Sequence, residues 1–278
     1  MLTQDNLLIE KQYNNKIIKS KIIEVIEMID THIHADARTG EDFNEMYLSG
    51  IDVAVTCAYY PYKIDNDTIL LNHLMRILNY DTKRANEHGI DLKVALGIHP
   101  TNTNVDGKLI YENLYKWIEN KDIVAIGEIG LENLTEKEYE IFKKQLDIAQ
   151  ETKTNVIIHT PRKNKSAVLD EILKILPQHI SPEYVVIDHI NSNVVEKVID
   201  TDYTLGLTVQ PQKMDKLEAI DILDNYGFDK FLLNSDISNK PSDPLSVPKT
   251  IRELTRLGFN KKEINKIAFK NAEKFFNF

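Results

Sequence analysis

The chain has 278 residues, of which 42% are hydrophobic and 28% are charged, and its formal net charge is −9 at pH 7. No stretch approaches the roughly 18 uninterrupted apolar residues that a membrane span needs. The acidic balance argues against a long interface that follows a DNA groove, because neutralisation of phosphates drives such binding. The first residues lack the apolar core of a signal peptide, and the single Cys57 cannot form an intramolecular disulfide. We therefore expect a cytoplasmic protein.

Along the chain, an extension precedes a regular alternation of strand and helix patterns. Residues 1–25 are polar and isoleucine-rich with the spacing of an amphipathic helix, and the main domain is expected at 26–278. The predicted strands are short, nearly continuous apolar runs, typical of strands buried on both faces, at 28–30, 53–57, 92–96, 123–126, 155–158, 184–187, 204–209 and 231–233. The predicted helices lie at 41–49, 66–88, 108–120, 135–152, 164–176, 192–200, 212–226, 245–257 and 261–275. This alternation predicts an α/β fold, a single (β/α)8 TIM barrel.

Potential metal ligands follow several of these apolar runs. They are His32, His34, Glu128, His159, His189 and Asp236. In a β/α barrel the carboxyl ends of the strands converge on the face where active sites lie, so these distant residues would meet in one pocket. Such a set of imidazoles and carboxylates suits two divalent ions.

One ion is expected where the first and last strands meet. His32 and His34 point to the same side of an extended segment, because side chains alternate along a strand. Asp236 follows the eighth strand, which lies beside the first when the barrel closes. Asp236 would touch both the metal and a water molecule, which makes it the candidate proton acceptor and donor.

The second ion is expected between His159 and His189, which end the fifth and sixth predicted strands. Glu128, flanked by glycines, and a water-derived hydroxide would bridge the two ions. Zinc suits the imidazole content, and manganese, magnesium and nickel are alternatives, because affinity order alone does not decide occupancy. Structural interpretations are also open: His32 and His34 as surface or core residues, His159 and His189 as hydrogen-bonded core residues, and Glu128 as a helix cap or ion-pair partner.

Several further side chains are candidates for holding a substrate. His99 follows the third strand and could donate a hydrogen bond or a proton, or it could be fixed structurally by the proline that follows it. Arg162 could clamp a phosphate with two hydrogen bonds, and Lys163 and Lys165 extend it into a basic cluster. The alternative is a solvated helix start with a salt bridge. Lys213, after the seventh strand, is a similar candidate.

The ordered motifs resemble those of a known family. They are HIH at 32–34, GIHP at 97–100, GEIGL at 127–131, HTPR at 159–162, DH at 188–189 and NSD at 234–236. Together they resemble TatD-type metal-dependent hydrolases of the amidohydrolase superfamily. The resemblance implies a two-metal barrel enzyme with the six ligands above, in a family with many assigned deoxyribonucleases and phosphoesterases.

The resemblance is to a divergent, archaeal-like branch of that family. Glu132 stands where the bacterial branch usually has an aspartate, and Thr101 follows GIHP where a second histidine is usual. Residues 190–193 read INSN in place of an aromatic-Ser-Gly stretch.

Three functions fit these observations. The first is hydrolysis of a phosphoester, either a small phosphorylated molecule or a nucleic-acid end. The second is amide, lactone or cyclic-imide hydrolysis, and the third is a catalytically idle, metal-stabilised scaffold, against which the full ligand set argues. A basic, phosphate-sized pocket would favour the first, a hydrophobic pocket the second and an occluded site the third. We expect no membrane association and no obligate protein partner.

Overall fold

The computed structural model describes residues 26–60, 62–239 and 242–278. The helix expected within residues 1–25 lies outside this part of the chain. Among the described residues, no helix is both long enough and apolar enough to span a bilayer.

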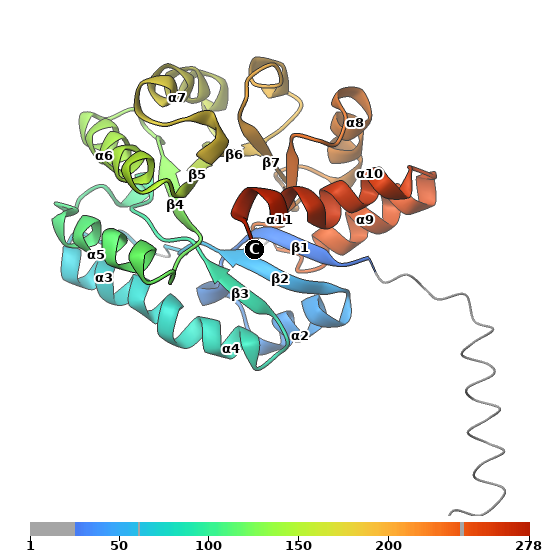
Figure 1. Ribbon diagram of the computed structural model, residues 1–278, viewed down its shortest axis with the longest axis horizontal. Helices are drawn as coiled ribbons and strands as arrows, with labels where there is room; N and C mark the ends of the chain where they lie inside the picture. Colours follow the sequence, from blue (N-terminus) through green and yellow to red (C-terminus); the bar gives the residue numbers. More distant parts are fainter. Residues whose placement is uncertain (1–25, 61, 240–241) are drawn as a thin grey trace, which may run out of the picture.

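Parallel strands form a closed barrel, as the alternating pattern predicts (Figure 1). The described residues form β1 (Met28–Ile33), β2 (Ile51–Thr56), β3 (Asp91–Val94), β4 (Ala125–Gly130), β5 (Asn155–His159), β6 (Val185–Ile190), β7 (Thr204–Thr208) and β8 (Phe231–Asn234). Hydrogen bonds pair them in the order β1-β2-β3 and β4-β5-β6-β7-β8. Parallel bridges between Ala95 and Ala125 and between Ile33 and Ile237 join the two sheets into a ring.

Helices surround this ring in Figure 1. They are α2 (Gly40–Leu48), α3 (Asp67–Arg76), α4 (Thr82–Asn86), α5 (Lys108–Glu119), α6 (Glu136–Thr152), α7 (Lys165–His179), α8 (Lys216–Tyr226), α9 (Ser246–Leu257), α10 (Lys261–Asn265) and α11 (Asn271–Phe276). The predicted helices at 66–88 and 261–275 each contain one π-helical turn, at Ile77–Asp81 and Lys266–Lys270.

The helix predicted at 192–200 is wrong. Only a single 3₁₀ turn forms there, at Val195–Lys197. The backbone leaves the helical region on both sides of this turn, with φ of −132° at Val194 and −125° at Val198. Val194, Val195 and Val198 are β-branched, which lowers the helix propensity of the segment. The connection between β6 and β7 therefore carries no helix of the outer ring.

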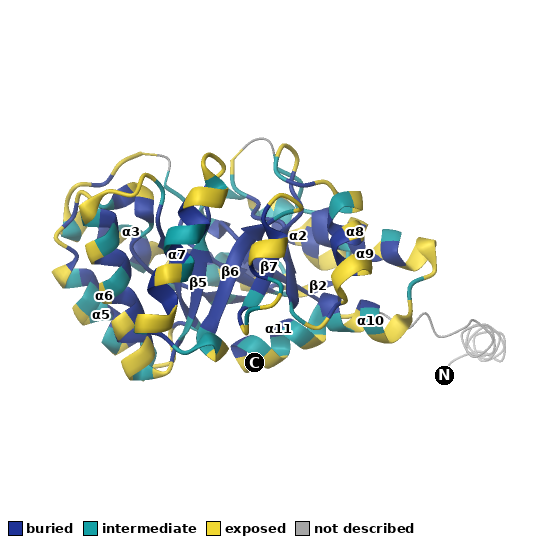
Figure 2. Ribbon diagram, turned by 90° about the horizontal axis from the view of Figure 1, so that it is seen from above, coloured by how far each residue is buried: buried dark blue, intermediate teal, exposed yellow. Residues whose placement is uncertain are grey.

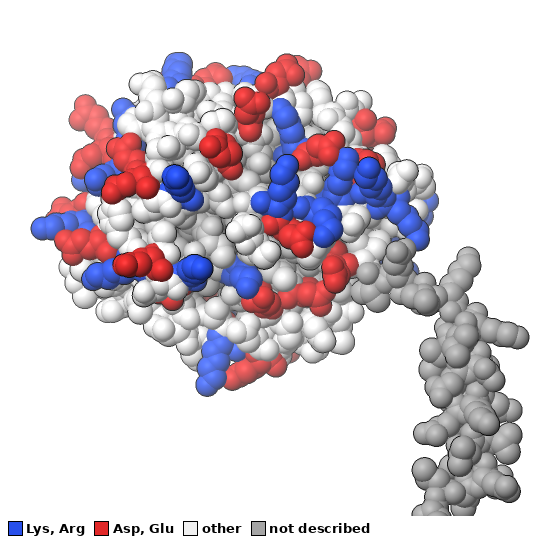
Figure 3. All heavy atoms as spheres, in the orientation of Figure 1, with Lys and Arg blue, Asp and Glu red and all other residues white. Residues whose placement is uncertain are grey.

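The barrel interior is apolar and is closed at the amino ends of the strands by the C-terminal helix. Its side chains include Ile29, Val55, Cys57, Ala95, Ala125, Ile157, Val186 and Leu232. Phe276 of α11 packs against them, and Figure 1 shows α11 lying across the centre of the barrel. Most strand residues are buried, and the helices expose their outer faces (Figure 2). On the face seen in Figure 3, acidic and basic side chains are interspersed.

Candidate metal centre

The structure brings the six expected ligands together at the carboxyl ends of the strands. His32 lies in β1, Glu128 in β4 and His189 in β6, His159 ends β5, and His34 and Asp236 follow β1 and β8. All but His159 are buried, and its side chain is only 14% exposed. Ligands taken from five separate strands thus converge as the barrel fold requires.

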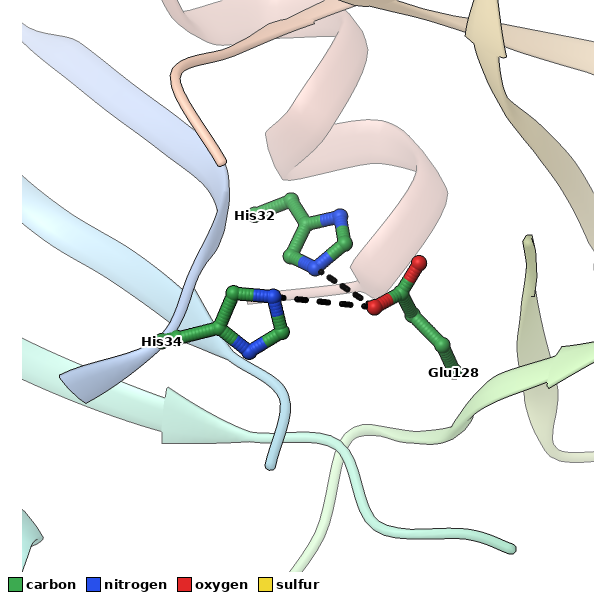
Figure 4. A group of neighbouring side chains, drawn as sticks. All are labelled: His32, His34 and Glu128. Carbon is green, nitrogen blue, oxygen red and sulfur yellow. Dashed lines mark ion pairs between the residues drawn. The ribbon is translucent and has the colours of Figure 1, made fainter. Parts of the chain in front are cut away.

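Glu128 lies at the centre of this group, and its two oxygens face different pairs of imidazoles. Oε2 lies 3.2 Å from Nε2 of His32 and 3.7 Å from Nε2 of His34, and Figure 4 shows both rings pointing toward this oxygen. Oε1 lies 3.0 Å from Nδ1 of His159 and 3.1 Å from Nε2 of His189. The carboxylate therefore separates the histidines into the two pairs expected from the order of the strands.

Asp236 lies on the side of the first pair. Its Oδ1 is 3.0 Å from Nε2 of His34, and its Oδ2 forms an ion pair with Lys213. The buried side chain of Gln210 donates to the backbone carbonyl of Asp236. Asp236 is thus held by contacts to both its side chain and its backbone.

The hydrogen bonds around the histidines determine which ring nitrogen is free. Nδ1 faces an acceptor in three rings: in His32 it is 2.6 Å from Oδ2 of Asp188, in His34 it is 3.1 Å from the carbonyl of Cys57, and in His189 it is 2.7 Å from Oγ1 of Thr208. A neutral imidazole that donates from Nδ1 keeps a lone pair on Nε2. These three lone pairs face Glu128.

This arrangement fits divalent cations. Lone pairs that face a carboxylate repel it unless a cation lies between them, and Nε2 of His32 is buried without a hydrogen-bond partner among the described residues. Two ligands that each lie about 2.1 Å from one ion are themselves about 3.0–3.5 Å apart. The nitrogen–oxygen distances around Glu128, from 3.0 to 3.7 Å, are of this size.

Electrostatics also favour metal binding. Burial and the neighbouring His32 lower the pKa of His34 to about 4, and burial and Lys213 lower that of His189 to about 3. Both rings are therefore neutral near pH 7, which is the form that binds metals. Burial alone would lower the pKa of His32, but Glu128 raises it well above its ordinary value, so a cation bound here would replace a proton on Nε2 of His32. The same negative charge would stabilise a bound cation.

His99 presents a donor rather than a lone pair to this centre. Its Nδ1 lies 3.1 Å from the backbone N–H of Thr101 and accepts from it, so the proton of the neutral ring is on Nε2. That nitrogen is 3.9 Å from Oε2 of Glu128. Burial and the nearby His159 hold the pKa of His99 well below its ordinary value, which keeps the ring neutral.

A cavity of about 150 Å³ lies beside His159 and His189. Its lining includes three basic residues, Arg162, Lys165 and Lys213. Burial lowers the pKa of both lysines to about 8. Lys163, which the sequence favoured as part of the basic cluster, is exposed and does not line this cavity.

The backbone is irregular where the candidate ligands lie. The ladders of β1, β4 and β6 each shift register next to their ligands. His189 and Asp236 have left-handed conformations, with φ of 61° and 45°. Such conformations cost a non-glycine residue about 1–2 kcal/mol and cluster at functional sites.

Other residues that support the site carry weaker signals in the sequence. Oε2 of Glu132 lies 3.0 Å from Nε2 of His159, so it holds the ring in place, and its only signal is its position after GEIGL. Asn234 donates to Oδ1 of Asp188 at 2.8 Å, as expected for residues that orient ligands. A Cβ atom at Gly206 of β7 would collide with that same oxygen, which no local sequence pattern indicates.

Comparison with known proteins shows the family to which this chain is similar. The family model described as TatD related DNase matches residues 29–277. An uncharacterized metal-dependent hydrolase of Methanocaldococcus jannaschii is 40% identical over 251 residues, which cover 90% of this chain and 99% of that protein. The TatD-like protein from Archaeoglobus fulgidus is similar in structure, with a TM-score of 0.76 and 29% identity over 90% of this chain and 100% of that one. A TatD homologue from Escherichia coli K12 has a TM-score of 0.66 and 20% identity, over 91% and 99% of the two chains.

Proposed function

This chain belongs to the family of TatD-related DNases, which makes it a metal-dependent hydrolase, and we propose that it hydrolyses phosphoester bonds with two divalent ions. The observation that carries this proposal is the division of the imidazoles by Glu128, whose two oxygens each face one pair. A carboxylate in that position is suited to bridging two cations. We further propose that residues 26–278 act as one hydrolase domain.

The expected ligands would hold the ions in two groups. His32, His34 and Asp236 would hold one ion, and His159 and His189 would hold the other, with Glu128 between them. When bound, such ions lower the pKa of a shared water and polarise the group to be cleaved. Zinc suits four imidazoles, and manganese, magnesium and nickel are the alternatives.

The remaining polar residues would carry the proton and the substrate. Asp236 would accept the proton of the attacking water and return it to the leaving oxygen as the phosphorus–oxygen bond breaks. His99 would donate from Nε2–H to an oxygen of the substrate, because its Nδ1 is already an acceptor. Arg162 and Lys213 would hold the negative oxygens of the phosphoryl group in the cavity.

The lining of the cavity supports a phosphoester over an amide or a lactone as substrate. Its volume of about 150 Å³ suits a phosphoryl group with a small substituent, or the end of a nucleic-acid strand. Arg162 and Lys213 would stabilise such an anion, whereas a neutral lactone would gain little from them. The open space beside the ligands also favours an enzyme over an idle scaffold.

Metal content and hydrolysis of a chromogenic phosphodiester, measured together, test this proposal in the wild type and in Asp236→Asn. We expect about two ions per wild-type chain and loss of most activity in the variant, because its amide cannot accept the proton. Two ions without phosphodiester hydrolysis would direct the search to amides and lactones. A chain that binds no ion after reconstitution would contradict the proposed two-metal mechanism.

A further inference from the structure

Lys165 lines the basic cavity but is not free to bind a substrate. It is the first residue of α7, and its side chain reaches back to the ends of β5 and β6. Nζ lies 3.2 Å from the carbonyl oxygen of Thr160, 2.7 Å from its Oγ1 and 2.8 Å from the carbonyl oxygen of His189. An ammonium group has three N–H donors, and these three protein oxygens use all of them.

The acceptors of Lys165 belong to the backbone that carries two candidate ligands. Thr160 directly follows His159, and its Oγ1 also donates to the carbonyl of Asp188 at 2.8 Å. Lys165 then holds the carbonyl of the next residue, His189. Thr160 and Lys165 thus connect the end of β5 to the carbonyl groups of two consecutive residues of β6, Asp188 and His189.

The backbone of His189 needs such a restraint. Its φ of 61° is left-handed, and the ladder between β6 and β7 shifts register between Ile187 and Ile190. Ladder hydrogen bonds alone therefore do not hold this segment in a regular strand geometry. A strained conformation persists only where surrounding contacts enforce it.

We propose that Lys165 is a positioning residue, which holds His159 and His189 at the spacing that one of the two metal ions requires. This inference rests on the proposed metal centre, but it does not depend on the substrate. It separates Lys165 from Arg162 and Lys213, which line the same cavity and which we propose as substrate-binding residues. Removing Lys165 should weaken one metal site and leave the other, formed at β1 and β8, largely intact.

The test is a titration of the metal-free protein with Co²⁺, followed by visible absorbance and by elemental analysis after gel filtration. We expect the wild type to bind two ions, and Lys165→Met to bind one normally and the other about 10- to 100-fold more weakly, as for other residues that orient metal ligands. Lys165→Arg keeps the charge and the donors, so it should recover part of the lost affinity. Lys174→Met is the matched control, because Lys174 is on the same helix, is exposed and pairs with Glu171.

A second variant and a second measurement cover the case in which Lys165→Met does not fold. Thr160→Val removes Oγ1 with little change of shape and should weaken the same ion. Amide hydrogen exchange in the metal-free protein should be faster at 187–191 in either variant than in the control.

The outcomes distinguish this inference from the proposed function. Unchanged affinity for both ions would overturn the positioning role, and a raised KM with both ions retained would make Lys165 a substrate-binding residue instead. Lower thermal stability with normal binding of both ions would show a general structural role and would also overturn it. Two ions in the wild type without phosphoester hydrolysis would contradict the proposed substrate but not the role of Lys165. A wild type that binds no ion would contradict both the proposed function and the positioning role.

Discussion

Glu128 is the side chain on which the candidate centre depends most, since each of its oxygens faces a different pair of histidines. Glu128→Ala should lose at least one of the two ions. The variant lacks the carboxylate that both ions would share, and the histidine nitrogens are left without its negative charge. Elemental analysis of the reconstituted protein measures this directly. Glu136→Ala, an exposed change at the start of α6, should keep both ions. Equal metal content in the two variants would contradict the two-metal centre.

Arg162 has a different expected effect, because it lines the cavity and makes no side-chain hydrogen bond to a candidate ligand. Within the described part of the chain, its side chain donates one hydrogen bond, to Oε1 of Gln210 at 3.3 Å, so most of its N–H donors remain for a substrate. Hydrogen bonds to charged groups contribute about 1.5–3 kcal/mol, so Arg162→Ala should raise the KM for a phosphodiester by about tenfold or more. Steady-state kinetics with parallel metal analysis test this, with exposed Arg252→Ala as the control. An unchanged KM would make Arg162 a surface residue only.

At the scale of elements, the contact between β6 and β7 helps to orient the candidate ligand His32. Gly206 of β7 leaves room for Asp188 of β6, whose Oδ2 accepts a hydrogen bond from Nδ1 of His32. In Gly206→Ala the new Cβ would displace the carboxylate, and His32 would lose the partner that orients its ring. We expect metal affinity to fall about 10- to 100-fold, measured by titration, while circular dichroism shows a folded chain. Normal affinity would mean that Asp188 does not orient His32.

The start of α2 allows a test that does not involve the metal centre. Thr39 and Asp42 form a capping box, and Arg38 donates to Oδ1 of Asp42 at 2.8 Å. Burial opposes ionisation of Asp42, but the hydrogen bonds from Arg38 and Thr39 lower its pKa overall. A lowered pKa in the folded state stabilises the protein above the ordinary pKa of an aspartate, about 4, and this contribution is lost as the pH falls through the folded-state value.

Asp42→Asn should therefore lower the Tm at pH 7 and have a smaller effect once the pH falls below the lowered folded-state pKa, where the wild-type carboxyl is also protonated. Thermal unfolding of both proteins across this pH range measures the difference. A difference in Tm that stays constant with pH would show that the charge of Asp42 does not contribute.

At the scale of the whole molecule, the ions would join strands from both sheets of the barrel. A ligand that binds only the folded state stabilises it by about 2.7 kcal/mol at 100 times its Kd, which shifts the Tm of a domain of this size by about 5–10 °C. Removal of metal with a chelator should lower the Tm by this amount, and added Zn²⁺ should restore it. The Glu128→Ala variant should respond less. A Tm that is insensitive to the chelator would contradict metal binding at the centre.

Most of the barrel could be predicted from local patterns. Each expected strand overlaps an observed one, because strands that are buried on both faces need continuous apolar runs. The error at 192–200 came from a helical spacing that ignored the low helix propensity of Val194, Val195 and Val198, and the backbone at Val194 and Val198 is not helical. The predicted barrel also placed His32, Glu128 and the other expected ligands on one face, where the structure has them.

The sequence by itself determined the fold, the family and the six candidate ligands, because each depends on residue type and on order along the chain. Only the tertiary structure decided which nitrogen of each ring is free, since the partners of Nδ1 come from other strands. It also separated Lys165, whose donors are all used inside the protein, from exposed Lys163 two residues away. Hydrogen bonds between distant segments and left-handed backbone at His189 arise only when the barrel closes, and no local pattern contains them.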